Sequence, residues 1–128
     1  MQLRDIMDRN VAVLTPDTPL REVVRQMSTT QVRLLPVCED GKLVGMITLR
    51  DLILRATAQG CDPETSAAHE VMTRQIVYCC EDQDVNAAAA LMAEYRLSRL
   101  PVLDRQGRLV GMITYNDLRK ERSTSMAA

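Results

Sequence analysis

Apolar residues in this chain follow a helical spacing twice, once in each half. An amphipathic helix places such residues at positions i, i+3, i+4 and i+7. The first set consists of Leu20, Val23, Val24 and Met27. The second set consists of Val85, Ala88, Ala89 and Met92. We therefore expect two matching helices, one from about Pro19 to Ser28 and one over residues 84–95.

Each helical stripe is followed by two short apolar runs that flank a turn. Residues 34–52 read LLPVCEDGKLVGMITLRDL, and residues 99–118 read RLPVLDRQGRLVGMITYNDL. The runs are rich in Val, Leu and Ile, which favours strands, and Asp40-Gly41 is a strong signal for a two-residue hairpin turn. A segment that recurs at this length indicates one supersecondary unit built twice. The predicted strands are 33–38, 42–47, 99–103 and 108–113.

The repeat also predicts elements on either side of each hairpin. These are short strands at 11–14 and 76–79, helices at 48–59 and 115–122, and short helices near 3–7 and 68–72. The predicted fold class is α/β (α+β), with two β-α-β-β-α repeats that pack with pseudo-twofold symmetry, because one such repeat buries too little surface to be stable alone. The expected domains are 1–59 and 67–122, with a linker at 60–66 and a tail at 123–128.

Composition excludes several classes of partner. The net charge is −1, so the chain has no general attraction to nucleic acid or to anionic membranes. Trp and Phe are absent and the three tyrosines do not cluster, so a stacking platform for single-stranded nucleic acid is not expected. No run approaches the roughly eighteen apolar residues of a membrane span, and the first residues do not resemble a secretory signal. We expect a cytoplasmic protein with neither nucleic-acid nor membrane partners.

The sequence offers no catalytic or metal-binding constellation. His69 is the only histidine, and neither a Gly-x-Ser-x-Gly motif nor a Cys-x-x-Cys pair occurs. A zinc site and a nucleophile with its base are therefore both unexpected, and the chain is predicted not to be an enzyme. The cysteines at 38 and 79 fall on strands and are expected to be buried. Cys80 should face the opposite side from Cys79, and Cys61, in a polar loop, is the expected reactive thiol.

The corner between the second strand of each hairpin and the next helix carries the candidate chemistry. It reads Gly-Met-Ile-Thr-x-x-Asp at residues 45–51 and again at 111–117. One interpretation is structural, since Ser/Thr followed three residues later by an acid is a capping box. The other interpretation is a nucleotide site. A helix N-terminus suits a phosphate, the acid can accept both hydroxyls of a ribose, and the glycine lets a ligand approach the backbone.

These repeated segments resemble a pair of cystathionine β-synthase (CBS) domains, a Bateman module, of the small stand-alone bacterial type. The resemblance covers residues 1 to about 122 and is carried by the segments LPV…DG.LVGMIT..DL. It implies a module that binds adenosine-containing ligands such as AMP, ADP, ATP or S-adenosylmethionine in clefts between the two repeats. No other cofactor is implied. By this resemblance Thr48 and Thr114 contact phosphate, and Asp51 and Asp117 hold the ribose.

The resemblance also implies residues that contact the base or the phosphate. They come from the start of each hairpin and from the strand before each helix: Arg33, Leu34, Pro36, Arg99, Leu100, Pro101, Val13 and Tyr78. The chain departs from the family pattern two residues before each proline. A small residue is common there, whereas this chain has Leu34 and Arg99, which either narrow the cleft or, for Arg99, reach a phosphate.

Two functions follow from this interpretation. The first is a non-enzymatic sensor of adenine nucleotides that forms a homodimer and regulates an unknown effector protein. The alternative is a ligand-free interaction scaffold, associated with stress responses. The helix positions Leu52, Ile53, Leu91 and Leu118 are expected either in a dimer interface or in the core of the chain itself.

Overall fold

The computed structural model describes residues 1–120, which form two compact units. The central unit comprises Ala12–Ile76. The terminal unit combines Met1–Val11 with the residues from Val77 onward. These units differ from the sequence repeats 1–59 and 67–122, because the short opening segment of each repeat packs into the unit formed by the other. The tail 123–128 and the last two residues of the helix expected at 115–122 lie outside the described residues.

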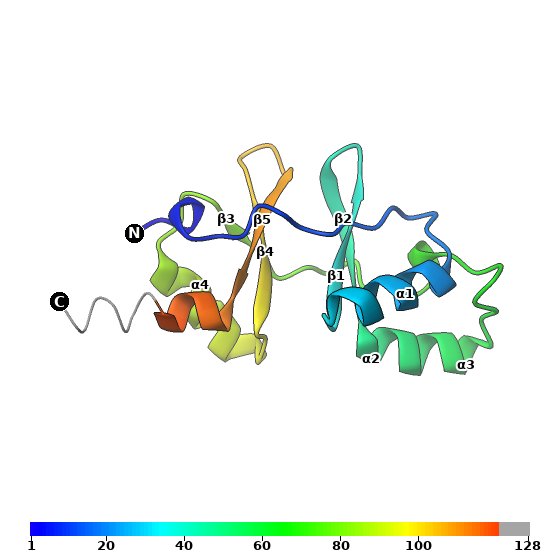
Figure 1. Ribbon diagram of the computed structural model, residues 1–128. Helices are drawn as coiled ribbons and strands as arrows, with labels where there is room; N and C mark the ends of the chain where they lie inside the picture. The colour runs from blue at the N-terminus through cyan, green and yellow to red at the C-terminus, as the bar shows by residue number, and fades with distance from the viewer. Residues whose placement is uncertain (121–128) are drawn as a thin grey trace. The chain divides into compact units, whose positions relative to one another are not determined.

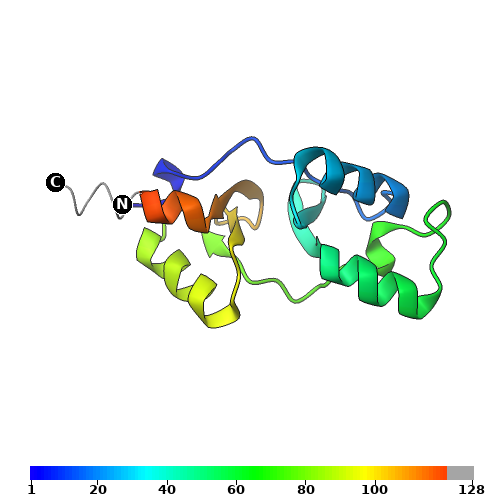
Figure 2. The same cartoon turned by 60° about the horizontal axis from the view of Figure 1, so that its bottom comes forward.

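The central unit is a two-stranded hairpin with helices beside it. Strands β1 (Leu34–Glu39) and β2 (Lys42–Thr48) pair antiparallel. Asp40 and Gly41 both have positive φ, as the predicted two-residue turn requires. Figures 1 and 2 show α1 (Leu20–Thr30) beside the helical segment after β2. That segment consists of α2 (Leu49–Asp51), the π turn η2 (Leu52–Ala56) and α3 (Thr57–Gln59).

The terminal unit contains a three-stranded sheet of order β3-β4-β5. Strand β3 (Cys79–Cys80) is parallel to β4 (Arg99–Leu103), and β4 is antiparallel to β5 (Leu109–Thr114). Helix α4 (Val85–Tyr95) precedes this hairpin, and residues 115–120 are helical after it (Figure 1). The mixed helices and sheets confirm the predicted fold class, and the bounds of the main elements fall within two residues of those expected.

The strands expected at 11–14 and 76–79 are shorter than predicted, and proline explains why. In the central unit the pairing consists of one parallel bridge between Leu14 and Val37. The Leu14 amide donates to the Pro36 carbonyl, and the Cys38 amide donates to the Leu14 carbonyl. The next bond toward the N-terminus would need an amide proton on Pro36, which proline lacks. Pro101 occupies the equivalent position in the terminal unit, where the strand begins only at Cys79.

Two short 3-10 helices complete the cores of the two units. They are η1 (Leu3–Asp5) in the terminal unit and η3 (Ala68–Glu70) in the central unit. The central core joins α1, the hairpin and η3 through Leu14, Leu20, Val23, Met27, Leu35, Val37, Ile47, Leu52, Ala68, Val71 and Met72. The terminal core consists of Leu3, Met7, Cys79, Ala88, Met92, Leu100, Val102, Ile113 and Leu118. Within residues 1–120 every helix is too short or too polar to cross a lipid bilayer.

A methionine after each 3-10 helix packs on the glycine of a hairpin. A Cβ atom on Gly45 would lie 2.5 Å from Met72 Sδ, and one on Gly111 would lie 2.7 Å from Met7 Sδ. The expectation that these glycines let a ligand approach the backbone is therefore wrong, since methionine side chains occupy that space. The glycines are required so that the segments after η1 and η3 can dock.

Substituting these glycines should destabilise the fold unequally. In Gly45→Ala the three atoms nearest to the new methyl group all belong to the Met72 side chain, which can partly move aside, so we expect a loss of about 1–3 kcal/mol. Gly111→Ala should cost more, because its methyl group also meets the Asp8 backbone carbonyl at 2.9 Å. Urea unfolding of both variants measures the difference. Equal stability of Gly111→Ala and the wild type would contradict this packing.

The cysteines should differ in reactivity as their burial differs. Cys38 and Cys79 are buried, as expected, whereas Cys61 and Cys80 are partly exposed. Burial raises the pKa of the Cys79 thiol to about 11, so the reactive thiolate forms only at pH values near or above this. At pH 8 an aromatic disulfide reagent should label Cys61 and Cys80 in the folded protein and Cys38 and Cys79 only after unfolding. Rapid labelling of Cys79 in the native state would contradict this assignment.

Candidate functional site

The corner of the central unit is a complete capping box. Thr48 ends β2 in an extended conformation and precedes the first residue of α2. Its amide donates to Asp51 Oδ2 at 2.9 Å, and the Asp51 amide donates to Thr48 Oγ1 at 3.0 Å. The two side chains thus satisfy backbone donors that a helix start leaves unpaired. The structural interpretation of this motif is confirmed.

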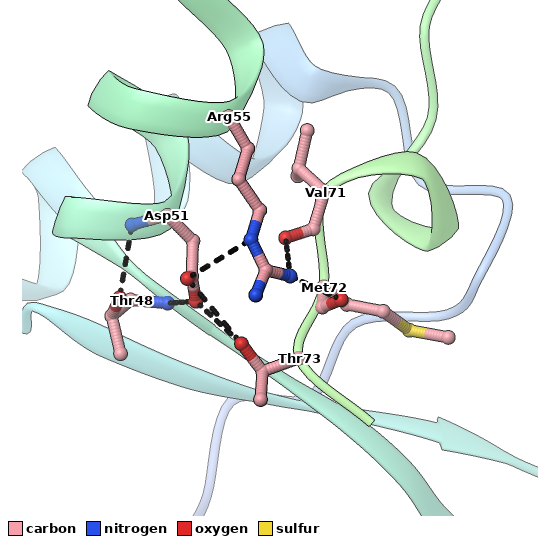
Figure 3. Close-up of polar contacts among 6 residues, drawn as sticks. All are labelled: Thr48, Asp51, Arg55, Val71, Met72 and Thr73. Atoms are coloured by element: carbon pink, nitrogen blue, oxygen red, sulfur yellow. Dashed lines mark hydrogen bonds and ion pairs between the residues drawn. The ribbon is translucent and has the colours of Figure 1, made fainter. Parts of the chain in front are cut away.

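Outside the capping box, Asp51 also accepts a hydrogen bond from a hydroxyl and forms an ion pair with an arginine. Thr73 Oγ1 lies 3.3 Å from both carboxylate oxygens, and Arg55 Nε lies 3.8 Å from Oδ1 (Figure 3). Arg55 Nη1 donates in turn to the carbonyls of Val71 and Met72, at 3.3 and 2.9 Å. The Asp51 side chain is 15% exposed. Both of its oxygens therefore have donors within the central unit.

The corner of the terminal unit repeats the cap without these additional donors. The Thr114 amide donates to Asp117 Oδ2 at 3.1 Å, and the Asp117 amide donates to Thr114 Oγ1 at 3.2 Å. Within residues 1–120, Asp117 accepts no other hydrogen bond, so Oδ1 is available to a ligand. Thr114 Oγ1 serves as an acceptor in the cap, which leaves its hydroxyl proton free to donate.

The strand residue that faces each threonine differs between the corners. Leu34 is the register partner of Thr48, and Arg99 is the register partner of Thr114. Directly opposed residues of an antiparallel pair project from the same face of the sheet, so each side chain lies beside its threonine. The Nε atom of Arg99 is buried and, among the described residues, has no hydrogen-bond partner. The terminal corner therefore contains an unsatisfied cationic donor, and the central corner an apolar group.

The other residues implied for the base contact differ in exposure. Pro36, Leu100 and Pro101 are fully buried, so their side chains belong to the cores. Val13 and Tyr78 are 42% and 48% exposed, and Arg33 is also exposed. A ligand beside either hairpin would meet the side chains of Leu34 or Arg99 but not those of Pro36, Leu100 or Pro101.

Sequence reasoning missed two residues beside Asp51 and one hollow elsewhere in the central unit. Arg55 and Thr73 were not recognised, because the two copies of the repeat differ at both positions and no repeated motif marks them. The hollow has a volume of about 480 Å³ and includes Arg33 but neither Thr48 nor Asp51. Its lining is Val24, Met27, Ser28, Gln31, Val32, Arg33, Leu49 and Leu52.

Comparisons with known proteins agree with this repeated architecture. The chain is 36% identical over 126 residues to the CBS domain-containing protein YhcV of Bacillus subtilis, covering 98% of this chain and 89% of that protein. The CBS domain pair of protein MJ0100, solved with 5′-methylthioadenosine and S-adenosyl-L-methionine, superposes with a TM-score of 0.81 at 28% identity and covers 98% of both chains. The cytosolic domain of the Mg²⁺ channel MgtE, solved with ATP, has a TM-score of 0.76 at 31% identity over 91% of this chain and 46% of that one.

The match to the family itself covers both repeats. The CBS-domain model matches residues 3–57 and 68–124. Each matched segment includes its own hairpin and its own Thr-x-x-Asp corner, so the duplication inferred from the sequence corresponds to two copies of one known domain. This chain belongs to the CBS-domain family and carries two CBS domains in tandem.

Proposed function

We propose that this protein is a non-enzymatic regulatory module that binds an adenosine-containing nucleotide at its strand-to-helix corners. One observation carries the proposal. In the terminal corner the helix cap uses only Oδ2 of Asp117, and no described residue donates to Oδ1. A carboxylate in this arrangement can accept hydrogen bonds from a ribose diol while it still caps the helix.

The groups around Asp117 suit the remainder of a nucleotide. The Thr114 hydroxyl can donate to a phosphate oxygen, and the buried Nε of Arg99 offers a charged donor that now lacks an acceptor. The start of the helix at 115–120 adds a positive partial charge. An anionic group bound here would satisfy Arg99, which otherwise bears the cost of an unpaired buried donor.

The ligands named for two relatives support the same chemical class. The MJ0100 pair was solved with 5′-methylthioadenosine and S-adenosyl-L-methionine, and the MgtE domain with ATP. These molecules share an adenosine and differ in charge beyond the ribose. We therefore propose adenosine as the recognised part, with AMP, ADP, ATP and S-adenosylmethionine as the candidates.

A ligand-free interaction scaffold is the second candidate, and the caps favour it. Both Thr-x-x-Asp motifs form capping boxes, which explains their presence without any ligand. On this alternative, Asp117→Ala costs about 1 kcal/mol of stability and added nucleotide changes nothing.

We further propose that the protein forms a homodimer through the helices of the central unit. Leu52 and Leu118, expected either at an interface or in the core, belong to the cores, and Leu91 packs against the terminal core. The large apolar side chains left exposed on the central helices are Val24, Leu49, Ile53 and Leu54. An apolar surface of this kind is typical of a site that a partner covers.

Nucleotide binding should depend on the two acids separately. Calorimetry with AMP, ADP, ATP and S-adenosylmethionine should give a Kd of about 1–500 μM for at least one of them. Asp117→Asn keeps a cap acceptor but weakens the acceptor for the ribose, so we expect about a tenfold loss of affinity at the terminal corner. Glu39→Gln, at the exposed end of the first hairpin, is the matched control and should bind as the wild type does.

The same titration separates the two candidate functions. Absence of heat with all four compounds, on protein whose melting curve is cooperative, would exclude the nucleotide module and leave the scaffold. Equal affinity of Asp117→Asn, Asp51→Asn and the wild type would show that binding occurs elsewhere.

Dimerisation should be sensitive to one exposed apolar residue. Ile53 is 58% exposed, so Ile53→Glu should leave the fold intact while it places a charge in the proposed interface. Multi-angle light scattering should report a dimer for the wild type and a monomer for this variant. If the wild type has the mass of a monomer at about 100 μM, the proposed dimer is contradicted.

A further inference from the structure

The two corners differ most in the residues that surround the capping acid. At the central corner these are Thr73 and Arg55, both hydrogen-bond donors. In the sequence repeat Thr73 corresponds to Asp8, and the backbones confirm the match. The Thr73 amide and carbonyl pair with Met46 as those of Asp8 pair with Met112. Arg55 lies four residues after Asp51, and the residue four after Asp117 is Glu121, which lies outside the described residues.

At both positions the central corner has a hydrogen-bond donor and the other repeat has an acid. The two corners therefore differ in chemistry. An ionised carboxylate accepts hydrogen bonds and cannot donate them. Asp8 is therefore unable to take the role that Thr73 has toward Asp51. The Asp8 side chain instead accepts from the Asn10 amide at 2.9 Å. The contact that engages Asp51 from outside its own helix can be made only in the central unit.

The Thr73 hydroxyl lies across the Asp51 carboxylate. Its Oγ1 atom is 3.3 Å from both carboxylate oxygens, so its one proton is shared between them. Asp51 Oδ2 faces the Thr48 amide and the Thr73 hydroxyl, while Oδ1 faces the same hydroxyl and Arg55 Nε. A ribose diol brings two more donors. A diol that donates to both oxygens together therefore competes with the Thr73 hydroxyl for the position between them.

Arg55 connects this carboxylate to the segment that leaves the central unit. It lies in the π turn η2, a rare widening of the helix that often marks a functional position. Its Nη1 atom donates to the carbonyl oxygens of Val71 and Met72, the two residues before Thr73 (Figure 3). Three residues after Thr73, at Ile76, the central unit ends.

We propose that Thr73 and Arg55 form a latch on Asp51 that a nucleotide must open. The latch lowers the affinity of the central corner relative to the terminal one. When a ligand binds Asp51 and opens the latch, residues 71–73 lose these contacts. The start of the segment that leads out of the central unit is then released. Thr73 and Arg55 are thus residues that determine affinity, and they transmit occupancy of the site. The consequences for affinity rest on the proposed function, whereas the latch itself can be tested without ligand.

The first experiment tests the latch in ligand-free protein. The Met46 amide is the reporter, because it donates to the Thr73 carbonyl at 2.9 Å and is remote from Thr73 in sequence. Thr73→Val removes the hydroxyl at nearly constant volume, and Thr73→Ser keeps it. Hydrogen exchange by NMR should be faster at Met46 by about threefold or more in Thr73→Val and in Arg55→Met, and unchanged in Thr73→Ser. Unchanged exchange in both of the first two variants would overturn the latch.

The second experiment tests competition between the latch and the ligand. Asp117→Asn serves as the background, so that calorimetry with AMP and with S-adenosylmethionine reports the central corner. Adding Thr73→Val should tighten binding about fivefold, while adding Thr73→Ser should leave the affinity unchanged. Equal or weaker binding by the Thr73→Val protein would mean that Thr73 supports the ligand, and the proposal would fail. If wild-type protein binds neither compound, the proposed function fails, and exchange at Met46 alone decides whether the latch exists.

Discussion

The contact between a methionine side chain and a bare glycine backbone positions the segment that runs past each capping corner. Met72 lies against Gly45, and Met7 lies against Gly111. Each contact docks a short segment from one repeat along the hairpin of the other, where backbone hydrogen bonds to Met46 and Met112 secure it. The residue after each methionine, Thr73 or Asp8, is thereby brought to the second strand of the hairpin. No feature of either hairpin alone would place a side chain there.

The two corners share the same helix cap but differ in the groups around the capping aspartate. Both begin a helix in the same way, with a threonine oxygen and an aspartate oxygen that satisfy backbone amides. The cap requires only one oxygen of each carboxylate. The surroundings of the second oxygen are consequently free to diverge without loss of the fold, and they have diverged: a hydroxyl and a guanidinium lie near Asp51, while no described donor reaches Oδ1 of Asp117.

The two repeats share core positions but differ beside the capping corners. Some equivalent core residues are identical, such as Val37 and Val102 or Ile47 and Ile113, and others differ, such as Leu14 and Cys79. The residues beside the threonines differ in charge, with Leu34 in one unit and Arg99 in the other. Two copies of one CBS domain can therefore retain a common architecture while they offer different environments to an adenosine ligand.

The sequence alone determined the local elements and the capping corners, because these depend on residues close together in the chain. Apolar spacing identified α1 and α4, Asp40-Gly41 identified the hairpin turn, and Thr-x-x-Asp identified both caps. Only the tertiary structure decided how the opening segments exchange between units, why Pro36 and Pro101 end a ladder, and that Thr73 and Arg55 reach Asp51. These features join residues far apart in the chain, such as Thr73 and Asp51, which are 22 positions apart. Such contacts follow from packing of methionine on glycine, and no periodicity in the chain encodes them.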